Sequence, residues 1–410
     1  MFLLKTEYFN KIYIIKGFIT AILLSTFIYL AHFGIEIKII NTILGLAGIY
    51  LLLTIPKKAL FYAGFFTGIF WCYWMAVSLQ YYGIAYVAPL LILGIGLVFG
   101  IIFFLFAIID KITFRIFMVF AFLFVSPFGF NWLKLELLFV DSYISTTKIA
   151  FALVLLSMYF VIKLKRAKVL AILPLLFTLN FGSGEFIDTT KAKIYMPQMN
   201  IQQDLKWQKE SLDDLIKYNL HQIFEAIENK YDLVILPETA FPIALNRYPQ
   251  IDIMLKELSN EIDIITGALY VENNKIFNAS YHYSKEKVQI AQKVVLVPFG
   301  EKIPLPKFFV DLINKVFYNG AQDYSEADNP TDFEVLGEKY RNAICYEGTT
   351  DKIYENLDDT RYMIMISNNA WFTPSIEPTL QHLLLKYYSK KYGITIFHTA
   401  NGSKNRIYRP

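Results

Sequence analysis

The first 182 residues contain a series of apolar runs, most of them close to the roughly 20 residues that a membrane-spanning helix needs. The runs cover about 14–34, 36–55, 59–78, 85–109, 113–131, 143–162 and 169–182. The last run is short and contains Pro174, so hydrophobicity alone fits either a membrane helix or a buried helix. We predict a multi-pass α-helical membrane bundle of about seven spans over residues 1–182.

The basic residues indicate which ends of these runs face the cytoplasm. With a cytoplasmic N-terminus, eleven Lys and Arg fall in the inside segments and three fall outside. The basic cluster at 163–168 is then cytoplasmic, so the run 169–182 must cross again and deliver the rest of the chain to the outer face. The run after Lys16 lacks a small-residue cleavage site, and we interpret it as an anchor rather than a signal peptide.

The two halves of the chain differ in charge. Residues 1–182 carry 14 Lys and Arg against 5 Asp and Glu, whereas residues 183–410 carry 25 against 30. Only 18% of the chain is charged and 17% is aromatic, which argues against a disordered chain or a nucleic-acid scaffold. Two cysteines, Cys72 and Cys345, cannot build a disulfide framework, and the five His are scattered, so we expect no metal.

After residues 182–186 the sequence changes to short β-rich runs that alternate with amphipathic helical stretches. We expect strands in KIYMPQM, YDLVILPE, IDIITGALY, KIFNASYHYS, VVLVP, NAICYE, YMIMISN and ITIFHTAN, and helices at about 208–229, 248–260, 305–317 and 375–391. NNK at 273–275 and KEK at 285–287 predict hairpin turns. Short apolar strands interleaved with helices predict an α/β layer architecture for residues 183–410.

Three reactive side chains lie at the ends of apolar runs. Glu238 ends LVILPE, Lys293 precedes VVLVPFGE, and Cys345 lies in NAICYE. A thiolate can attack a carbonyl, a partly desolvated carboxylate can take the thiol proton, and a buried ammonium can stabilise the oxyanion. We therefore assign these roles to Cys345, Glu238 and Lys293 in an acyl-transfer reaction. Singly, each residue has an ordinary structural alternative: an inert buried thiol, a helix-end charge or a solvated lysine.

The segments around these residues carry a family resemblance. LPETAFP, KVVLVPFGEKIP and ICYE, in this order, resemble the carbon–nitrogen hydrolase (nitrilase) superfamily, whose catalytic trio is Glu, Lys and Cys. Preceded by a membrane bundle, the chain is similar to the bacterial apolipoprotein N-acyltransferase family. Further matches are MPQMNIQQDLKW, PFGE, ISNNAWF, Gln381-His382 and, more weakly, GIFWCYWMAVSL. The resemblance implies a nitrilase-like α-β-β-α sandwich for residues 183–410.

The resemblance also implies a two-step reaction. Cys345 takes a fatty acyl group from a phospholipid, expected to be phosphatidylethanolamine, and forms a thioester. The acyl group then passes to the α-amine of the diacylglyceryl cysteine of an apolipoprotein. The partners are thus a phospholipid donor, diacylated apolipoproteins and membrane lipid, with no nucleic acid and no cofactor. The implied location is the bacterial inner membrane, with the catalytic domain on the periplasmic side; the oligomeric state does not follow from the sequence.

Further residues are expected to support the trio. Trp207 stands where the family has a tryptophan, Glu301 follows Lys293 by eight residues, and Tyr346 and Glu347 flank the nucleophile, with Glu347 a candidate for orienting Lys293. Candidates for lining an acyl-chain path, with ordinary packing as the alternative, are Phe241, Phe299, Phe308, Phe309, Asn369 and Trp371.

The end of the chain departs from the family. It stops at HTANGSKNRIYRP, where the family continues through further strands and a final membrane helix, so we expect a C-terminally short domain with either an exposed sheet edge or an unfilled sandwich layer. Asn369 and Thr373 replace the family's Asp and Gly. Two other functions stay open: a membrane-anchored amidase, in which water resolves the thioester, and a non-enzymatic binding or scaffold protein.

Overall fold

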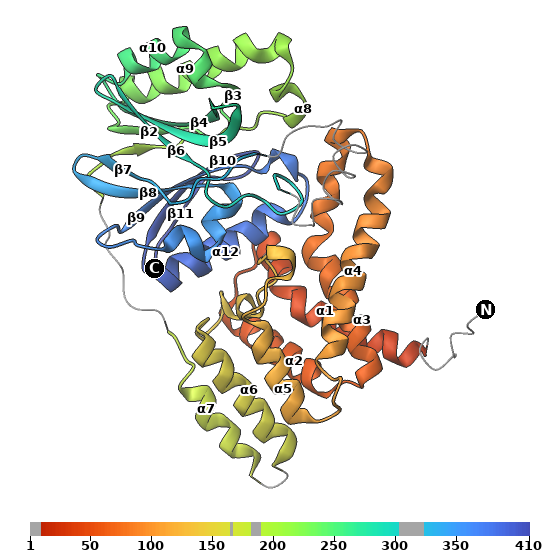
Figure 1. Ribbon diagram of the computed structural model, residues 1–410. Helices are drawn as coiled ribbons and strands as arrows, with labels where there is room; N and C mark the ends of the chain where they lie inside the picture. Colours follow the sequence, from red (N-terminus) through yellow and green to blue (C-terminus); the bar gives the residue numbers. More distant parts are fainter. Residues whose placement is uncertain (1–9, 165–166, 182–189, 303–323) are drawn as a thin grey trace. The chain divides into compact units, whose positions relative to one another are not determined.

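The computed structural model describes residues 10–164, 167–181, 190–302 and 324–410 (Figure 1). The chain forms two compact units. The helical unit takes in Met1–Pro127, Asn131–Glu185 and Pro374–Tyr387, and the sheet-containing unit takes in Phe128–Phe130, Phe186–Thr373 and Tyr388–Pro410. The division therefore differs from a single boundary at residue 182 in two short segments. The predicted helix at 305–317, the linker at 182–186, Phe308 and Phe309 lie outside the described residues.

The helical unit is built from apolar helices. Its helices are α1 (Lys11–His32), α2 (Lys38–Thr54), α3 (Lys57–Cys72), α4 (Ala88–Leu105), α5 (Ile112–Phe122), α6 (Lys148–Lys163) and α7 (Ile172–Leu176). Four stretches of the described chain are long and apolar enough to cross a membrane: Lys11–His32, Lys57–Tyr82, Ala85–Leu105 and Ile112–Gly129. The helix α2 is apolar but shorter. The first six predicted apolar runs therefore each contain one of the helices α1–α6.

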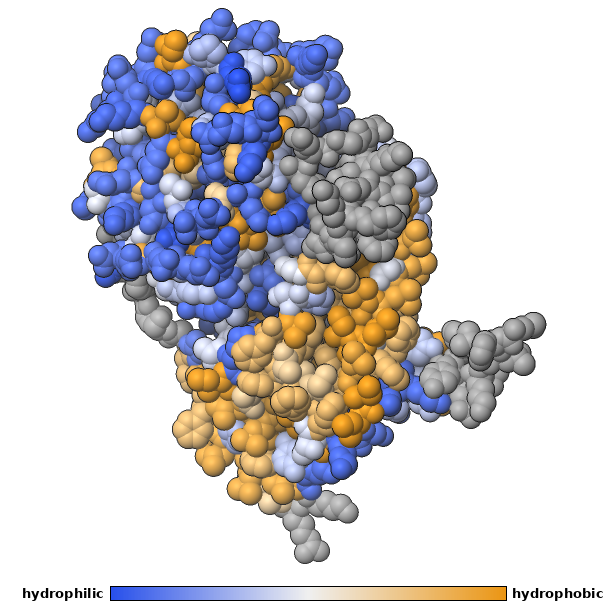
Figure 2. Space-filling view, viewed as in Figure 1, coloured by the Kyte–Doolittle hydropathy of each residue, from blue (hydrophilic) through white to orange (hydrophobic). Residues whose placement is uncertain are grey.

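Glycine allows two of these helices to touch. A Cβ atom on Gly64 of α3 would collide with the carbonyl oxygen of Phe99 on α4, so only glycine permits this approach. On the other side, α4 exposes Leu90, Leu93 and Leu97 at helical spacing. Figure 2 shows the continuous apolar surface of this unit and the mainly hydrophilic surface of the other unit. The exposed stripe is the face that a bilayer would cover.

The seventh predicted span does not form one regular helix. Lys168–Ala171 is a four-residue 3-10 turn, and α7 is only five residues long and contains Pro174. At about 1.5 Å per residue these pieces fall well short of a hydrocarbon core of about 30 Å. Beyond them, Thr178 and Asn180 pair in extended form with Ser145 and Tyr143. Within the described residues 167–181 the chain therefore forms no single helix of spanning length, and both the number of crossings and the side reached after Gly182 stay predictions.

The second unit contains two sheets. The first has the order β1-β2-β4-β5-β6, with β3 on β4, and the second has the order β11-β10-β9-β8-β7. The strands are β1 (Ile194–Tyr195), β2 (Leu233–Ile235), β3 (Phe241–Ala244), β4 (Asp263–Glu272), β5 (Lys275–Ser284), β6 (Lys287–Gln292), β7 (Asp332–Val335), β8 (Glu338–Ile344), β9 (Tyr362–Asn368), β10 (Thr395–Asn401) and β11 (Arg406–Tyr408). In the second sheet β8, β9 and β10 run parallel, so their carboxyl ends share one edge.

The layers form the predicted α-β-β-α sandwich. Figure 1 shows α9 (Leu212–Glu228) and α10 (Pro249–Leu258) outside the first sheet, while α12 (Glu377–Tyr392) is divided between the two units at Tyr387. Alternate residues of β2 face different cores: Val234 packs toward α9 and α10, whereas Leu233 and Ile235 pack between the sheets. The strand is therefore buried on both faces, as its continuous apolar run predicts.

Both predicted hairpin turns are present. Glu272 pairs with Lys275 and Ser284 pairs with Lys287, and all four residues between them have positive φ, as a type I′ turn requires. The prediction of a strand in VVLVP is wrong, because β6 ends at Gln292 and the chain then becomes irregular. The short or half-exposed strands β3, β6, β7 and β11 were not predicted. Of these, β11 pairs antiparallel with β10, the last of the predicted strands.

Candidate active site

Cys345 lies directly after β8, at the carboxyl end of the parallel strands. Its φ is +54°, in the left-handed region that residues other than glycine seldom adopt. Such backbone strain is concentrated at functional sites, where the surrounding structure must hold it in place. The side chain is half-buried, whereas the other cysteine, Cys72, is buried in α3. The nucleophile predicted from the sequence therefore sits at an accessible turn.

Glu238 follows β2 and is 7% exposed. Its Oε1 accepts a hydrogen bond from Nδ2 of Asn278 at 2.7 Å. The backbone at Glu238 turns sharply, because Thr239 has a φ of +46°. This turn packs directly on Gly267 of β4, where a Cβ atom would lie 2.7 Å from Cα of Glu238 and 2.5 Å from the nitrogen of Thr239. Glycine at 267 is therefore required by the position of Glu238.

Lys293 follows β6 and is completely buried. Its Nζ lies 2.7 Å from Oε2 of Glu301, so the two side chains form a buried ion pair. Burial alone would lower the pKa of Lys293, but the negative charges of Glu301, Glu238, Cys345 and Glu347 outweigh it and raise the pKa above its ordinary value. Lys293 therefore remains a cation over the neutral pH range.

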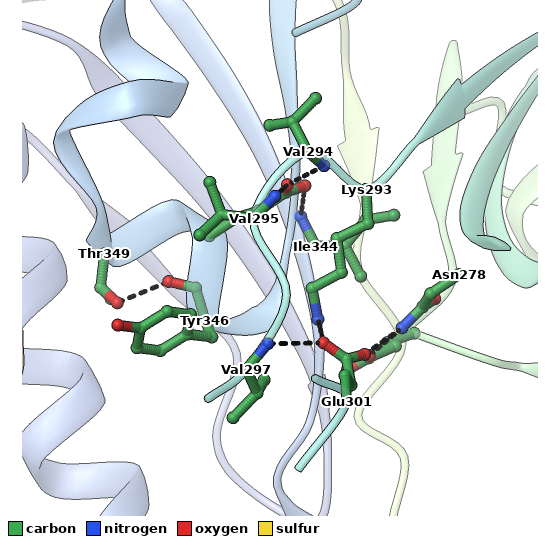
Figure 3. A network of polar contacts seen from close by, with 11 residues as sticks. Asn278, Lys293, Val294, Val295, Val297, Glu301, Ile344, Tyr346 and Thr349 are labelled. Atoms are coloured by element: carbon green, nitrogen blue, oxygen red, sulfur yellow. Dashed lines mark hydrogen bonds and ion pairs between the residues drawn. The ribbon is translucent and has the colours of Figure 1, made fainter. Parts of the chain in front are cut away.

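Asn278, on β5, links the two carboxylates and was not predicted from the sequence. Its Nδ2 also donates to Oε1 of Glu301 at 3.1 Å, while its backbone carbonyl accepts from the amide of Lys293 at 2.9 Å (Figure 3). Glu301 is fixed further by the backbone amide of Val297 at 2.9 Å. The only signal in the sequence was an Asn in the middle of the buried strand KIFNASYHYS.

Glu347 holds the backbone on both sides of the site. One carboxylate oxygen accepts from the amides of Val294 and Val295 at 2.7 and 3.2 Å, and the other accepts from the amide of Ile344 at 2.6 Å (Figure 3). These amides directly follow Lys293 and precede Cys345. Burial raises the pKa of Glu347 to about 7, opposed by Lys293 and the three amides. The bonds to Glu347 also explain why VVLVP leaves the sheet.

The remaining predicted residues lie in different environments. The Tyr346 hydroxyl donates to the carbonyl of Gly129 at 3.0 Å, and its ring stacks on Phe130. Trp207 is 44% exposed at the end of α8 (Gln203–Lys206). Trp371 is half-buried, and Asn369 is buried with its amide donating to Ser403.

Phe241 and Phe299 differ sharply in exposure. Phe241 is fully buried in the core between the first sheet and its helices, which agrees with the packing alternative. Phe299 is 46% exposed and packs edge-on against Phe128. The structure thus places Glu238, Lys293 and Glu301 in one network of hydrogen bonds, with Cys345 and Glu347 close enough for their charges to act on Lys293, whereas a substrate-lining role stays a prediction. The described residues contain no group of His, Cys, Asp or Glu that could hold a metal ion.

Comparison with known proteins identifies the family. Residues 11–181 match the apolipoprotein N-acyltransferase integral membrane domain. Apolipoprotein N-acyltransferase of Wolinella succinogenes is 41% identical, covering 95% of this chain and 94% of the relative. Apolipoprotein N-acyltransferase of Campylobacter jejuni is 36% identical, and the match covers 97% of this chain and 90% of the relative. Among solved structures, a CN-hydrolase superfamily protein of Xanthomonas campestris has a TM-score of 0.40 and 14% sequence identity. The match covers 51% of this chain and 76% of that protein. By the match of its membrane domain and by its identity to a relative over nearly the whole chain, this protein belongs to the apolipoprotein N-acyltransferase family.

Proposed function

We propose that Cys345 carries the acyl group as a thioester during acyl transfer to the N-terminus of apolipoproteins, the reaction of this family. The observation that supports this role best is the buried network around the trio. A single amide, Asn278, bonds both Glu238 and Glu301, and Glu301 holds the ammonium of Lys293. Two groups that acyl transfer needs, a carboxylate base and a cation, are thereby fixed relative to each other, and the charge of Cys345 acts on the same cation.

The first half-reaction loads the thiol. Glu238 takes the proton of Cys345, and the thiolate attacks an ester carbonyl of a phospholipid, which we propose to be phosphatidylethanolamine. The tetrahedral oxyanion is stabilised by the Lys293 ammonium in a site with little water. The intermediate collapses with cleavage of the ester C–O bond, and the leaving alkoxide takes the proton from Glu238. The products are lysophospholipid and acyl-Cys345.

The second half-reaction transfers the acyl group from Cys345 to the apolipoprotein. The α-amine of a diacylglyceryl cysteine attacks the thioester carbonyl, and Glu238 removes a proton from the nitrogen. The C–S bond breaks, the amide is released, and the proton on Glu238 returns to the thiolate of Cys345. Both substrates are lipids, so we propose that the site faces the periplasmic leaflet of the inner membrane, as the basic residues between the apolar runs predict.

Labelled phosphatidylethanolamine tests this mechanism. The full-length protein in detergent micelles should accumulate an acyl group on Cys345 that hydroxylamine removes, and adding a diacylated lipopeptide should transfer the label to its amine. Cys345→Ala should abolish both signals, whereas Cys72→Ala, which changes a buried cysteine in α3, should leave them unchanged. Release of free fatty acid without transfer would instead favour the amidase, and unchanged lipid binding without any thioester would favour a binding protein.

The proposed location needs a separate test. A cysteine placed at an exposed position of the catalytic unit, such as Lys339→Cys, is offered a membrane-impermeant thiol reagent in intact cells with a permeabilised outer membrane. Labelling in intact cells would support a periplasmic site. Labelling that appears only after the inner membrane is opened would refute it.

A further inference from the structure

Lys206 is a buried lysine that the proposed mechanism does not use. Its side chain is 1% exposed, and its Nζ donates to the main-chain carbonyl of Glu238 at 2.9 Å. Burial lowers the pKa of Lys206 to about 7, while the charge of Glu238 opposes this change. Burying an amine costs folding free energy unless it is well bonded. Ordinary surface packing therefore does not account for a lysine at this position.

The short helix that carries Lys206 is fixed to the second sheet by three amides. Oε1 of Gln203 accepts from Nδ2 of Asn368 at 2.7 Å, and Oδ1 of Asn368 accepts from Nδ2 of Asn401 at 2.9 Å. Asn401 also bonds the backbone amide and carbonyl of Ile201, at 2.7 and 2.9 Å. All three side chains are at most 2% exposed. Asn368 and Asn401 are the last residues of β9 and β10, and Cys345 follows the end of the parallel strand β8. The helix α8 is therefore anchored at the same edge of the second sheet as Cys345.

The turn at Glu238 depends on support from outside its own strand. Thr239 is β-branched and has a positive φ, which is a strained backbone conformation. The backbone of Gly267 blocks the turn on one side. The ammonium of Lys206 bonds the carbonyl of the same turn, and it is the contact by which α8 reaches Glu238. The turn is thus held between β4 and an element anchored on the second sheet.

We propose that Lys206 is a positioning residue that fixes the main chain of Glu238, with Gln203, Asn368 and Asn401 as its anchor. The inference rests on the proposed role of Glu238 as the base. A displacement of about 1 Å at a reacting group can cost on the order of 100-fold in rate. Because Lys206 bonds the carbonyl and not the carboxylate, its loss should slow proton transfer from the thiol without changing the affinity for lipid.

The test is single-turnover formation of acyl-Cys345 in the full-length protein, with labelled phosphatidylethanolamine at several concentrations. We expect Lys206→Met to lower the rate constant roughly 10- to 100-fold, with full final labelling and an unchanged half-saturating lipid concentration. Lys206→Gln, which keeps a donor on a shorter chain, should recover part of the rate. A purely structural role would reduce the labelled fraction and leave the rate constant of the remainder unchanged, and that result would overturn the proposal.

Two controls separate this inference from the mechanism on which it rests. Lys256→Met removes an ammonium that pairs with Asp252 at 2.7 Å on α10, and it should keep the wild-type rate constant and labelling. Glu238→Gln should lose thioester formation. If Glu238→Gln is inactive but Lys206→Met reacts at the wild-type rate, only the role of Lys206 is refuted. If Glu238→Gln reacts at the wild-type rate, the proposed mechanism itself is refuted.

Discussion

Replacing Glu301 by Gln should make the activity sensitive to alkaline pH. The exchange keeps the shape of the side chain but removes the charge that lies 2.7 Å from Nζ of Lys293. Lys293 is completely buried and the Glu301 side chain is 12% exposed, so this is a buried ion pair. Removing one partner of a buried ion pair typically lowers the free energy of unfolding by about 3–5 kcal/mol. Glu301 is also the strongest of the charges that raise the pKa of Lys293, so its removal should lower that pKa.

The direction of the pH dependence follows from whether the folded or the unfolded state binds the proton of Lys293 more tightly. In the wild type the pKa of Lys293 is raised, so the stabilisation from this cation is fully present below the pKa of an unfolded lysine and is lost only as pH rises through the folded value. In Glu301→Gln the burial of Lys293 is less well compensated, and the ammonium loses its proton at a lower pH. Because the neutral amine stabilises an oxyanion poorly, the rate should decline as pH rises through the alkaline range.

The assay is the single-turnover rate of thioester formation between about pH 6 and 10. The wild type should show no loss attributable to Lys293 in this range, whereas the rate of Glu301→Gln should fall relative to the wild type toward the alkaline end. The matched control is Glu326→Gln, which removes an ion pair of nearly the same length, 2.8 Å to Lys302, at an exposed site. Solvent-exposed ion pairs contribute little free energy, so the rate of this variant should depend on pH as the wild-type rate does. A Glu301→Gln profile identical to the wild type would refute the reasoning.

Three further changes test the frame of the site. Gly267→Ala places a methyl group against the backbone of Glu238, so it should lower the free energy of unfolding by about 1–3 kcal/mol and reduce activity. The control Gly94→Ala, which has open space around it, should leave stability and activity unchanged. Thermal unfolding measures the stability of each variant, and the thioester assay measures its activity. Asn278→Leu should slow thioester formation by about 100-fold with little change in half-saturating lipid, because both carboxylates lose their shared donor, and an unchanged rate would count against the network. Arg341→Met removes a buried guanidinium that bonds one carboxylate and three carbonyls, so the melting temperature should fall by several degrees; an unchanged melting temperature would contradict this.

The sequence by itself determined the division into an apolar and a mixed half and the central strands, and it singled out the candidate trio. Hydrophobic runs and alternation act locally, so the buried strands such as β9 and the two hairpin turns can be recognised from neighbouring residues. Cys345, Glu238 and Lys293 could be assigned because each lies at the end of an apolar run and because the surrounding segments match a family. Glu301 was likewise found through its motif.

Only the tertiary structure decided how these residues are held. Asn278 and Lys206 act through partners that are 40 and 32 residues away in the chain, and no local pattern marks such a pairing. The segment after Lys293 has the composition of a strand but leaves the sheet, because the carboxylate of Glu347 takes the amides that a neighbouring strand would have used. A hydrogen bond formed across the fold thus outweighs local β propensity, since a buried amide must be paired and either partner satisfies it.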